Sequence, residues 1–430
     1  MHDRGMKGAE RGFPLPPTAN HGTTNEETMN YRILSLDGGG TWALIQVKAL
    51  IEIYSEKSRG RAVLEDFDLV AANSGGSIVL GGLVENLTLA ELLAEFEDEE
   101  WRKSVFSPTE SVVDQLIRFA GVGPKYNAAH KLPVLQRAMP TMGDVPLNKV
   151  TEGIRRPGAR ADVHLLITAF DYDRNRATFF RSADTSGPNW GTADTNAPNW
   201  GTGDASEASL AEAIHASTNA PVNYFDAPAE ISRGRYWDGA ISACNNPVLA
   251  AVTEAITLSQ SPTDIVALAI GTGSVLRPLA RPGEDSPLAQ PIGKPCFVND
   301  LRKVATAILD DPPDVATFLA HVMTGGGRGL RKPAADSRIV RMSPLISSVR
   351  KRGKLRPECR SITDEEFEKL ANLDLDVIQQ SDVDLISRYA DLWLDDKAPN
   401  QPIRMNGDTF EPELGQKSFK KALAAWKAIR

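Results

Sequence analysis

The sequence predicts an α/β fold in which helices cover a mainly parallel central sheet. Two observations carry this prediction. A short apolar strand, a glycine-rich turn and a helix with one apolar face follow one another twice near the start of the chain, and this alternation is typical of parallel sheets. The apolar fraction of 41% in 430 residues is also that of an ordinary globular protein, which can build a sizeable core.

The first of these units starts with an apolar strand over residues 32–36, which ends at a glycine-rich turn, residues 37–41. Beyond the turn, apolar side chains recur every three or four residues from Leu44 to Tyr54. This spacing predicts a helix with one buried face.

The second unit has a buried strand over residues 67–71, a turn over 73–77 and a helical stretch over 78–83. Two later apolar runs, residues 162–170 and 265–270, predict further strands of the same sheet.

Composition excludes several classes of protein. Acidic residues outnumber basic ones by 56 to 48, and the resulting net charge of −8 argues against a dedicated nucleic-acid binder. No apolar run reaches the roughly 18 residues that a membrane-spanning helix needs. The cysteines Cys244, Cys296 and Cys359 have no ligand-like spacing, so the sequence indicates neither a disulfide framework nor a metal site.

The organisation of the chain is predicted in three parts. Residues 1–30 lack the apolar stretch of a secretory signal and are predicted to be a disordered tail, which favours a cytoplasmic location over export without a cleaved signal. Residues 31–280 form the core, and residues 281–430 form an extension that packs on it. Residues 181–208 are predicted to be an inserted polar loop with a near repeat of Pro-Asn-Trp-Gly-Thr, whose tryptophans touch a substrate or a membrane in the sharper interpretation.

The extension contains a basic stretch followed by an acidic one. Residues 326–360 carry eleven Lys or Arg against two acids, and residues 363–396 are acidic with a helical apolar pattern. Basic and acidic stretches that follow each other in this way usually form ion pairs with each other or face solvent. Contact with an anionic lipid surface is the sharper alternative.

Ser74 is the candidate nucleophile. It follows a buried strand and opens a helix, as the serine of a nucleophile elbow does, and small neighbours leave room for a substrate. The usual pattern is Gly-x-Ser-x-Gly, whereas this chain has Ala72, Asn73, Ser74, Gly75 and Gly76. By itself the match is weak, because many glycine-rich turns are purely structural.

The first glycine turn strengthens the prediction. It also lies between a strand and a helix, so its backbone N–H groups can converge on an anion. Ester hydrolysis needs such donors for the oxyanion of the tetrahedral intermediate. Gly38, Gly39 and Gly40 are therefore the candidate oxyanion hole of a serine esterase.

The serine needs a base, for which the sequence offers two candidates. Asp238 lies between aromatic residues and a glycine turn, where its carboxylate can reach a serine hydroxyl directly. His321 is the histidine that fits a Ser-Asp-His order, although its helical surroundings favour a structural role.

Together these residues resemble the patatin-like phospholipase family. The shared features are the Asp-Gly-Gly-Gly loop at 37–40, the serine elbow at 67–76 and the Asp-Gly-Ala motif at 238–240, in the order of that family. Residues 216–225, 245–247 and 267–273 are also similar. The resemblance spans about residues 31–274 and, weakly, residues 341–345, and several ordered motifs make it more specific than the elbow alone.

The resemblance implies a three-layer α/β/α fold with a helical C-terminal extension, and lipid acyl hydrolysis without cofactor or metal. Ser74 would attack the ester, Asp238 would take its proton, and the three glycine amides would hold the oxyanion. The implied partners are a fatty-acyl lipid substrate and a membrane surface touched from one side; no nucleic acid is implied, and no protein activator is indicated. One departure is Trp42 and Ala43 where the family has a basic residue and a glycine, which removes a positive charge near the oxyanion site.

Three alternatives remain at this stage. The run Asp-Gly-Gly-Gly-Thr at 37–41 also resembles the phosphate loop of actin-like sugar kinases, but these continue into a β-hairpin rather than a helix. An esterase with His321 as its base is the second alternative. A binding protein that has lost the chemistry is the third, and the presence of Ser74 and Asp238 gives it no support.

Overall fold

The computed structural model describes most of the chain between Asn30 and Arg430. The predicted tail and nearly all of the predicted inserted loop lie outside the described residues. The structure describes residues 30–109, 123–159, 161–182, 208–222, 224–231, 234–258, 260–293, 313–326, 337–406 and 411–430.

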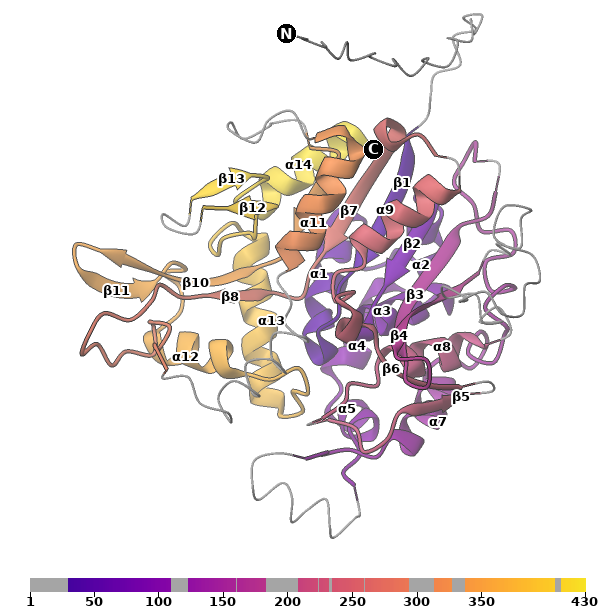
Figure 1. The fold of residues 1–430 in the computed structure, drawn as a ribbon, viewed down its shortest axis with the longest axis horizontal. Helices are drawn as coiled ribbons and strands as arrows, with labels where there is room; N and C mark the ends of the chain where they lie inside the picture. The colour runs from indigo at the N-terminus through magenta and orange to yellow at the C-terminus, as the bar shows by residue number, and fades with distance from the viewer. Residues whose placement is uncertain are drawn as a thin grey trace, which may run out of the picture.

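The centre of the molecule is an eight-stranded sheet (Figure 1). Its strand order is β5-β6-β3-β2-β1-β7-β9. Strand β4 pairs with the edge of β3 that β2 and β6 leave free. All pairings among β3, β2, β1, β7 and β9 are parallel, and those that β4, β5 and β6 form are antiparallel. The strands are β1 (Tyr31–Leu36), β2 (Leu69–Ala72), β3 (His164–Asp171), β4 (Arg176–Arg181), β5 (Ala229–Ile231), β6 (Gly234–Asp238), β7 (Ile265–Ile270) and β9 (Ile339–Met342).

Alternate residues of the sheet face two separate cores, which gives the molecule three layers. In β1, Leu34 and Leu36 point into the larger core and Ile33 into the smaller one. Helices α1, α3, α4, α8 and α12 to α14 contribute to the larger core, and α9 and α11 to the smaller one. The helices are α1 (Leu44–Ile53), α2 (Gly60–Leu64), α3 (Ser74–Val84), α4 (Leu89–Glu97), α5 (Glu99–Val105), α7 (Lys131–Ala138), α8 (Leu210–Ser217), α9 (Val248–Thr257), α11 (Pro313–His321), α12 (Asp364–Asn372), α13 (Gln380–Leu394) and α14 (Phe419–Ile429).

This architecture confirms the predicted three-layer α/β/α fold with a mainly parallel sheet. The four predicted strands correspond to β1, β2, β3 and β7, with boundaries that differ by at most two residues from the prediction. Both predicted helices are present as α1 and α3. The kinase alternative is wrong, because the glycine loop continues into helix, first the 3-10 helix η1 (Gly40–Ala43) and then α1, instead of a hairpin.

The C-terminal residues are part of the same architecture. Strand β9 pairs with β7 in the central sheet, and α13 lies against α1. Trp393 of α13 and Trp426 of α14 are fully buried in the larger core, where the Trp426 ring stacks on Phe67 at 5.9 Å. The predicted boundary at residue 280 stays a prediction, but residues beyond it supply one edge of the sheet and part of its covering layer.

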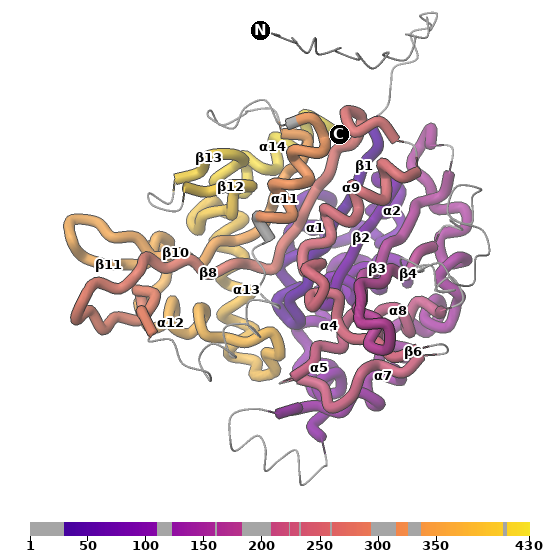
Figure 2. Tube along the Cα trace, viewed as in Figure 1, coloured from indigo at the N-terminus to yellow at the C-terminus, as the bar shows by residue number. Residues whose placement is uncertain are grey.

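Two smaller sheets complete the fold. In the first, β10 (Leu345–Lys351) pairs with β8 (Ser274–Leu276) and with β11 (Lys354–Pro357). The second consists of β12 (Arg404–Met405) and β13 (Pro412–Leu414). Figures 1 and 2 show β8, β10 and β11 extending away from the central sheet. None of the described helices is long and apolar enough to cross a membrane.

Because Trp426 joins the last helix to the first half of the chain, its removal tests whether the extension stabilises the core. We expect Trp426→Ala to lower the free energy of unfolding by about 3–5 kcal/mol, as large-to-small changes of buried aromatic residues do. The exposed neighbour Lys427 is the matched control, and Lys427→Ala should change the stability by less than about 0.5 kcal/mol. Denaturant unfolding measures both, and equal stability of the two variants would contradict the expectation.

Candidate active site

The candidate site forms where two strands end on the same edge of β3. The other edge of β3 is taken by β4, so β2 and β6 must share the remaining one. Strand β2 ends with Ala72 opposite Ile167, and the antiparallel β6 ends with Asp238 opposite Ala169. The two strand ends therefore approach each other at Thr168, and this brings Ser74 to Asp238.

Ser74 occupies a strained turn at the start of α3. Its φ of +47° lies in the left-handed region, which costs a residue with a side chain about 1–3 kcal/mol. The preceding Asn73 is extended, with φ −129° and ψ 145°, so the chain reverses between these two residues. The Ser74 N–H donates to the hydroxyl of Ser217 at 2.9 Å, which helps to hold the turn. This is the local geometry expected of a nucleophile elbow.

Asp238 is buried and accepts two hydrogen bonds. The Asn73 side-chain amide and the Ala240 N–H donate to Oδ1 at 3.0 and 2.9 Å, and the Ser74 side chain lies close enough to influence the carboxyl group. Asn73 is held in turn by Thr168, whose hydroxyl donates to Asn73 Oδ1 at 2.7 Å. The orientation of Asp238 toward Ser74 is therefore fixed from both strand ends.

The surroundings of Asp238 favour a carboxylate that accepts protons readily. Burial raises the pKa of the Asp238 carboxyl above its ordinary value, and the Ser74 side chain and the hydrogen bonds from Ala240 and Asn73 act in the opposite direction. The fully buried Lys131 also attracts its charge. The Lys131 ammonium donates to Asn219 Oδ1 at 2.9 Å, and burial lowers its own pKa well below the usual range.

The glycine loop lies directly against the serine. A Cβ atom on Gly38 would be 3.0 Å from Ser74 Cβ, so the loop and the elbow are in contact. The Gly38 N–H already donates to the Asn245 carbonyl at 2.8 Å, which makes it unsuitable for an oxyanion. Gly39 and Gly40 are partly exposed, and within the described part of the chain their N–H groups have no acceptor. Of the three N–H groups predicted to bind an oxyanion, the geometry therefore leaves those of Gly39 and Gly40 as candidates.

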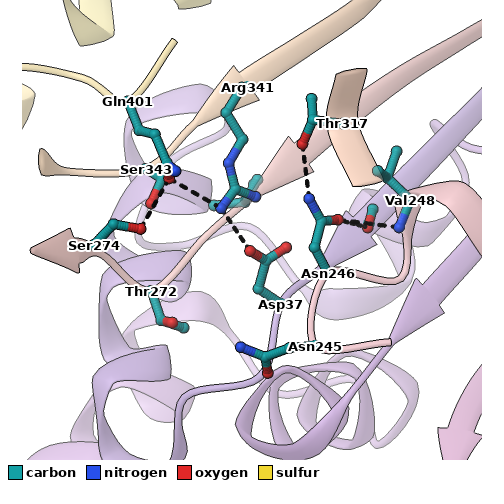
Figure 3. A network of polar contacts seen from close by, with 12 residues as sticks. Asp37, Asn245, Asn246, Val248, Thr272, Ser274, Thr317, Arg341, Ser343 and Gln401 are labelled. Atoms are coloured by element: carbon teal, nitrogen blue, oxygen red, sulfur yellow. Dashed lines mark hydrogen bonds and ion pairs between the residues drawn. The ribbon is translucent and has the colours of Figure 1, made fainter. Parts of the chain in front are cut away.

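Asp37, the first residue of this loop, is held by a buried ion pair. Arg341 of β9 donates to Asp37 Oδ2 at 2.6 Å, and both side chains are only 2% exposed. Figure 3 shows the guanidinium directed at the carboxylate, although β9 and β1 are separated in the sheet by β7. Burial raises the pKa of Asp37 and the arginine opposes that shift. A cation from the C-terminal residues therefore lies against the loop, although the sequence after the glycines has Trp42 in place of a basic residue.

The segment between α12 and α13, residues 373–379, covers the other side of the glycine loop, and we call it the strap. Its Leu375 carbonyl accepts from the Thr41 N–H at 3.0 Å and would be 2.3 Å from a Cβ on Gly40. The indole of Trp42 donates to the Asp374 carbonyl at 3.0 Å. Trp42 is thus a buried packing residue that binds the strap.

An aromatic cluster lies near Asp238, with Lys131 between the Asp238 charge and the Phe225 ring. Trp237, Leu375 and Ile378 pack against the cluster, so the strap bridges the glycine loop and this cluster. The strap is fastened there by Arg102, which donates to the Ile378 carbonyl at 3.0 Å. The cluster consists of Val105, Phe106, Tyr126, Ala128, Val134, Ala220, Tyr224 and Phe225.

The structure separates His321 from Ser74. His321 ends α11, in the layer opposite α3, and its Nδ1 lies 2.9 Å from the hydroxyl of Ser337. Ser337 precedes β9 and therefore lies at the edge of the sheet where the parallel strands begin, whereas Ser74 follows the end of β2. The geometry accordingly favours Asp238 over His321 as the partner of the serine.

Comparison with known proteins identifies the family. The sequence model of the family described as patatin-like phospholipase matches residues 34–252, which is just over half of the chain. The chain belongs to the patatin-like phospholipase family. No curated protein matches the sequence. Among solved structures, VipD from Legionella pneumophila is similar at 10% identity with a TM-score of 0.32, over 85% of this chain and 67% of VipD.

The family match contains the glycine loop, Ser74 and Asp238, and ends inside α9. Arg341 and the strap lie beyond the matched residues. The distant likeness to VipD carries no argument about activity. Among the described residues, no group of three or more His, Cys, Asp or Glu side chains is arranged to hold a metal ion.

Several neighbours of the site escaped the sequence analysis. Asn73 was singled out only as part of the elbow, and Ser217 and Arg341 only as members of segments similar to the family. Thr168 and Lys131 belong to no motif. The one available signal was a polar residue inside an apolar run, as for Thr168 in β3 and Arg341 in β9. Such a residue is usually hydrogen-bonded when it is buried, but its partner cannot be read from the run itself.

The close approach of the glycine loop to the elbow predicts that Gly38 tolerates no side chain. In Gly38→Ala the new methyl group would be 2.2 Å from Asn245 Oδ1 and 2.7 Å from Asn73 Nδ2. We expect kcat on a soluble ester to fall about 100-fold or more, because the oxyanion donors shift, and stability to fall by about 1–3 kcal/mol. Gly293→Ala is the control, since a methyl group there meets nothing within 4 Å. Wild-type kcat in Gly38→Ala would contradict this geometry.

The buried ion pair makes a second prediction. Arg341→Met leaves the Asp37 charge buried without its partner, and we expect unfolding to become easier by about 3–5 kcal/mol. The double variant Asp37→Asn with Arg341→Met removes that charge and should recover part of the loss. Arg338→Met, three residues earlier and only partly buried, is the control. Chemical denaturation compares the four proteins, and a stable single variant would show that the pair does not hold the loop.

Proposed function

We propose that this protein hydrolyses fatty-acyl esters of lipids through a Ser74–Asp238 dyad and an acyl-enzyme. Membership of the family supports lipid acyl hydrolysis in general terms. The finer assignment, with a phospholipid or lysophospholipid as the substrate, is our proposal. The observation that carries it is the position of Ser74, on a strained elbow beside the buried Asp238 carboxylate and next to a glycine loop with two unengaged N–H groups.

In the first half of the reaction, Ser74 Oγ attacks the carbonyl carbon of the ester while its proton passes to Asp238. The carbonyl oxygen becomes an oxyanion, which accepts from the N–H groups of Gly39 and Gly40. Collapse of this intermediate breaks the ester C–O bond, and the departing alcohol takes the proton back from Asp238. A fatty acyl group then remains on Ser74.

In the second half, a water molecule attacks the acyl-enzyme and gives its proton to Asp238. The same glycine amides stabilise the second oxyanion. When the bond to Ser74 breaks, the proton returns from Asp238 to the serine, and the fatty acid leaves. Neither half needs a histidine.

The electrostatic surroundings support a carboxylate as the general base. An exposed aspartate is a weak base at neutral pH, because its pKa lies near 3.9. Burial of Asp238 raises its pKa, and this increases its affinity for the serine proton.

The dyad predicts complete dependence on both side chains. Ser74→Ala and Asp238→Asn should each lower fatty-acid release from mixed phospholipid vesicles by at least about 1000-fold, without added metal and with a chelator present. Asp395→Asn, an exposed aspartate that follows the last residue of α13, is the matched control and should keep wild-type activity. His321→Ala should keep most activity as well. Persistent release by Ser74→Ala would rule out the nucleophile, and loss of release in His321→Ala would favour a histidine base.

The raised pKa of Asp238 predicts the acid limb of the pH profile. Asp238 acts as a base only when it is ionised, so kcat/KM should fall as the pH decreases through its pKa. Because burial raises this pKa, the midpoint should lie above the value of about 3.9 for an exposed aspartate. The measurement is kcat/KM on a soluble ester against pH, for wild type and His321→Ala. A midpoint that moves in His321→Ala, or a flat profile down to the ordinary aspartate value, would contradict the assignment.

A further inference from the structure

The small sheet β8–β10–β11 stands out from the body of the protein on the side of the candidate site. Strand β8 follows β7 after three residues, and β10 follows β9 after two. Both therefore start at the edge where the parallel strands end, which is also where the glycine loop and Ser74 lie. Figure 2 shows this sheet extending beyond the helices that cover the core. We call β8, residues 277–293 and the β10–β11 hairpin the projection.

The hairpin of the projection is strongly basic. Residues 345–360 contain six Lys or Arg and one acid, a net charge of 6 − 1 = +5 in a chain of −8. Arg350 is paired with Glu284. The other cations around the turn are exposed, and the structure pairs none of them with a described carboxylate; these are Lys351, Arg352, Lys354 and Arg356.

The ribbon beside the hairpin exposes apolar side chains. Ile292 and Leu279 are 70% and 68% exposed, the highest values among the large apolar residues that the structure describes. They belong to the same ribbon, because Leu279 and Gln290 form a β-bridge. Val275 of β8 is also exposed. An exposed apolar group next to cations is the combination by which proteins bind the surface of an anionic membrane.

The ribbon and the hairpin form one unit. Arg350 donates to both carboxylate oxygens of Glu284 at 2.7 Å, and the Ser348 hydroxyl donates to the Leu288 carbonyl at 2.6 Å. Helix α12 packs against the hairpin and brings acids with it, of which Glu366 is paired with Arg388. The exposed cations and apolar groups are thus held together on one support.

We propose that the projection docks the protein on anionic lipid bilayers, with Leu279 and Ile292 in the interface and the hairpin cations against the headgroups. This inference rests on the proposed function. It adds that the lipid substrate lies in a negatively charged membrane, and that the edge of the sheet with Ser74 faces this membrane. Charge complementarity favours an anionic bilayer as the partner, because the hairpin is basic and the rest of the chain is acidic. An anionic surface therefore attracts the hairpin. Leu279 and Ile292 distinguish a bilayer from a soluble polyanion, because a soluble polyanion has no apolar interior into which these side chains could insert.

The test measures binding without hydrolysis, so that it does not depend on the proposed chemistry. The full chain with Ser74→Ala is sedimented with phosphatidylcholine vesicles that contain or lack phosphatidylglycerol. We expect binding only with phosphatidylglycerol and a decrease with added salt. Reversal of the hairpin charges (Lys351→Glu, Arg352→Glu, Lys354→Glu and Arg356→Glu together) should weaken partitioning by roughly 100-fold or more. Leu279→Ser with Ile292→Ser should weaken it roughly tenfold.

A matched control reverses three exposed cations of α14, Lys420, Lys421 and Lys427, and should bind as the parent does. In the background with Ser74 intact, the hairpin variant should keep wild-type turnover of a soluble short-chain ester and lose activity on anionic vesicles. Equal binding to both vesicle types, or an equal loss in the α14 control, would overturn the proposal. Retention on heparin or nucleic acid without vesicle binding would also overturn it, in favour of a soluble polyanion. A protein that binds vesicles but hydrolyses no ester would refute the proposed function and leave the docking surface standing.

Discussion

The site depends on one constraint in the sheet: β2 and β6 share a single edge of β3. Because β4 occupies the other edge, the parallel β2 and the antiparallel β6 must meet end to end beside Thr168. The residue that follows one strand end is Asn73 and the last residue of the other is Asp238, and they are hydrogen-bonded at 3.0 Å. Backbone pairing thus supplies the proximity that a two-residue catalytic site needs, and no flexible loop has to carry either group.

A second layer of interactions keeps the glycine loop in position. The loop must stay open to a substrate, so most of its support comes from behind and from the side. The buried pair of Asp37 and Arg341 holds its first residue, and the strap holds its last through Thr41 and Trp42. Both supports come from residues after the family match. The C-terminal residues therefore complete the site as well as the sheet, and a patatin-like core cut off before β9 would lose the cation that faces Asp37.

The proposed chemistry and the proposed docking surface share one orientation. The projection grows from the ends of β7 and β9, on the same sheet edge as the oxyanion donors. A protein seated on a bilayer through its basic hairpin would face the membrane with the edge that carries Ser74. Electrostatic attraction would bring the protein to the bilayer, and the exposed apolar residues would retain it there. The proposed dyad itself stays buried, where hydrogen bonds are stronger than in water.

The sequence by itself determined the fold class and four of the five parallel strands, and it singled out Ser74, Asp238 and the glycine loop as candidate site residues. These are local features: strand periodicity, glycine turns and small neighbours are written into consecutive residues. The tertiary structure decided what depends on partners distant in sequence. It showed that the Gly38 amide is already engaged, and that His321 lies at the other end of the sheet. It also showed that Arg341 brings a cation to a loop whose own sequence lacks one. Buried polar partners are chosen by strand order and register, and these arise only when the whole sheet assembles.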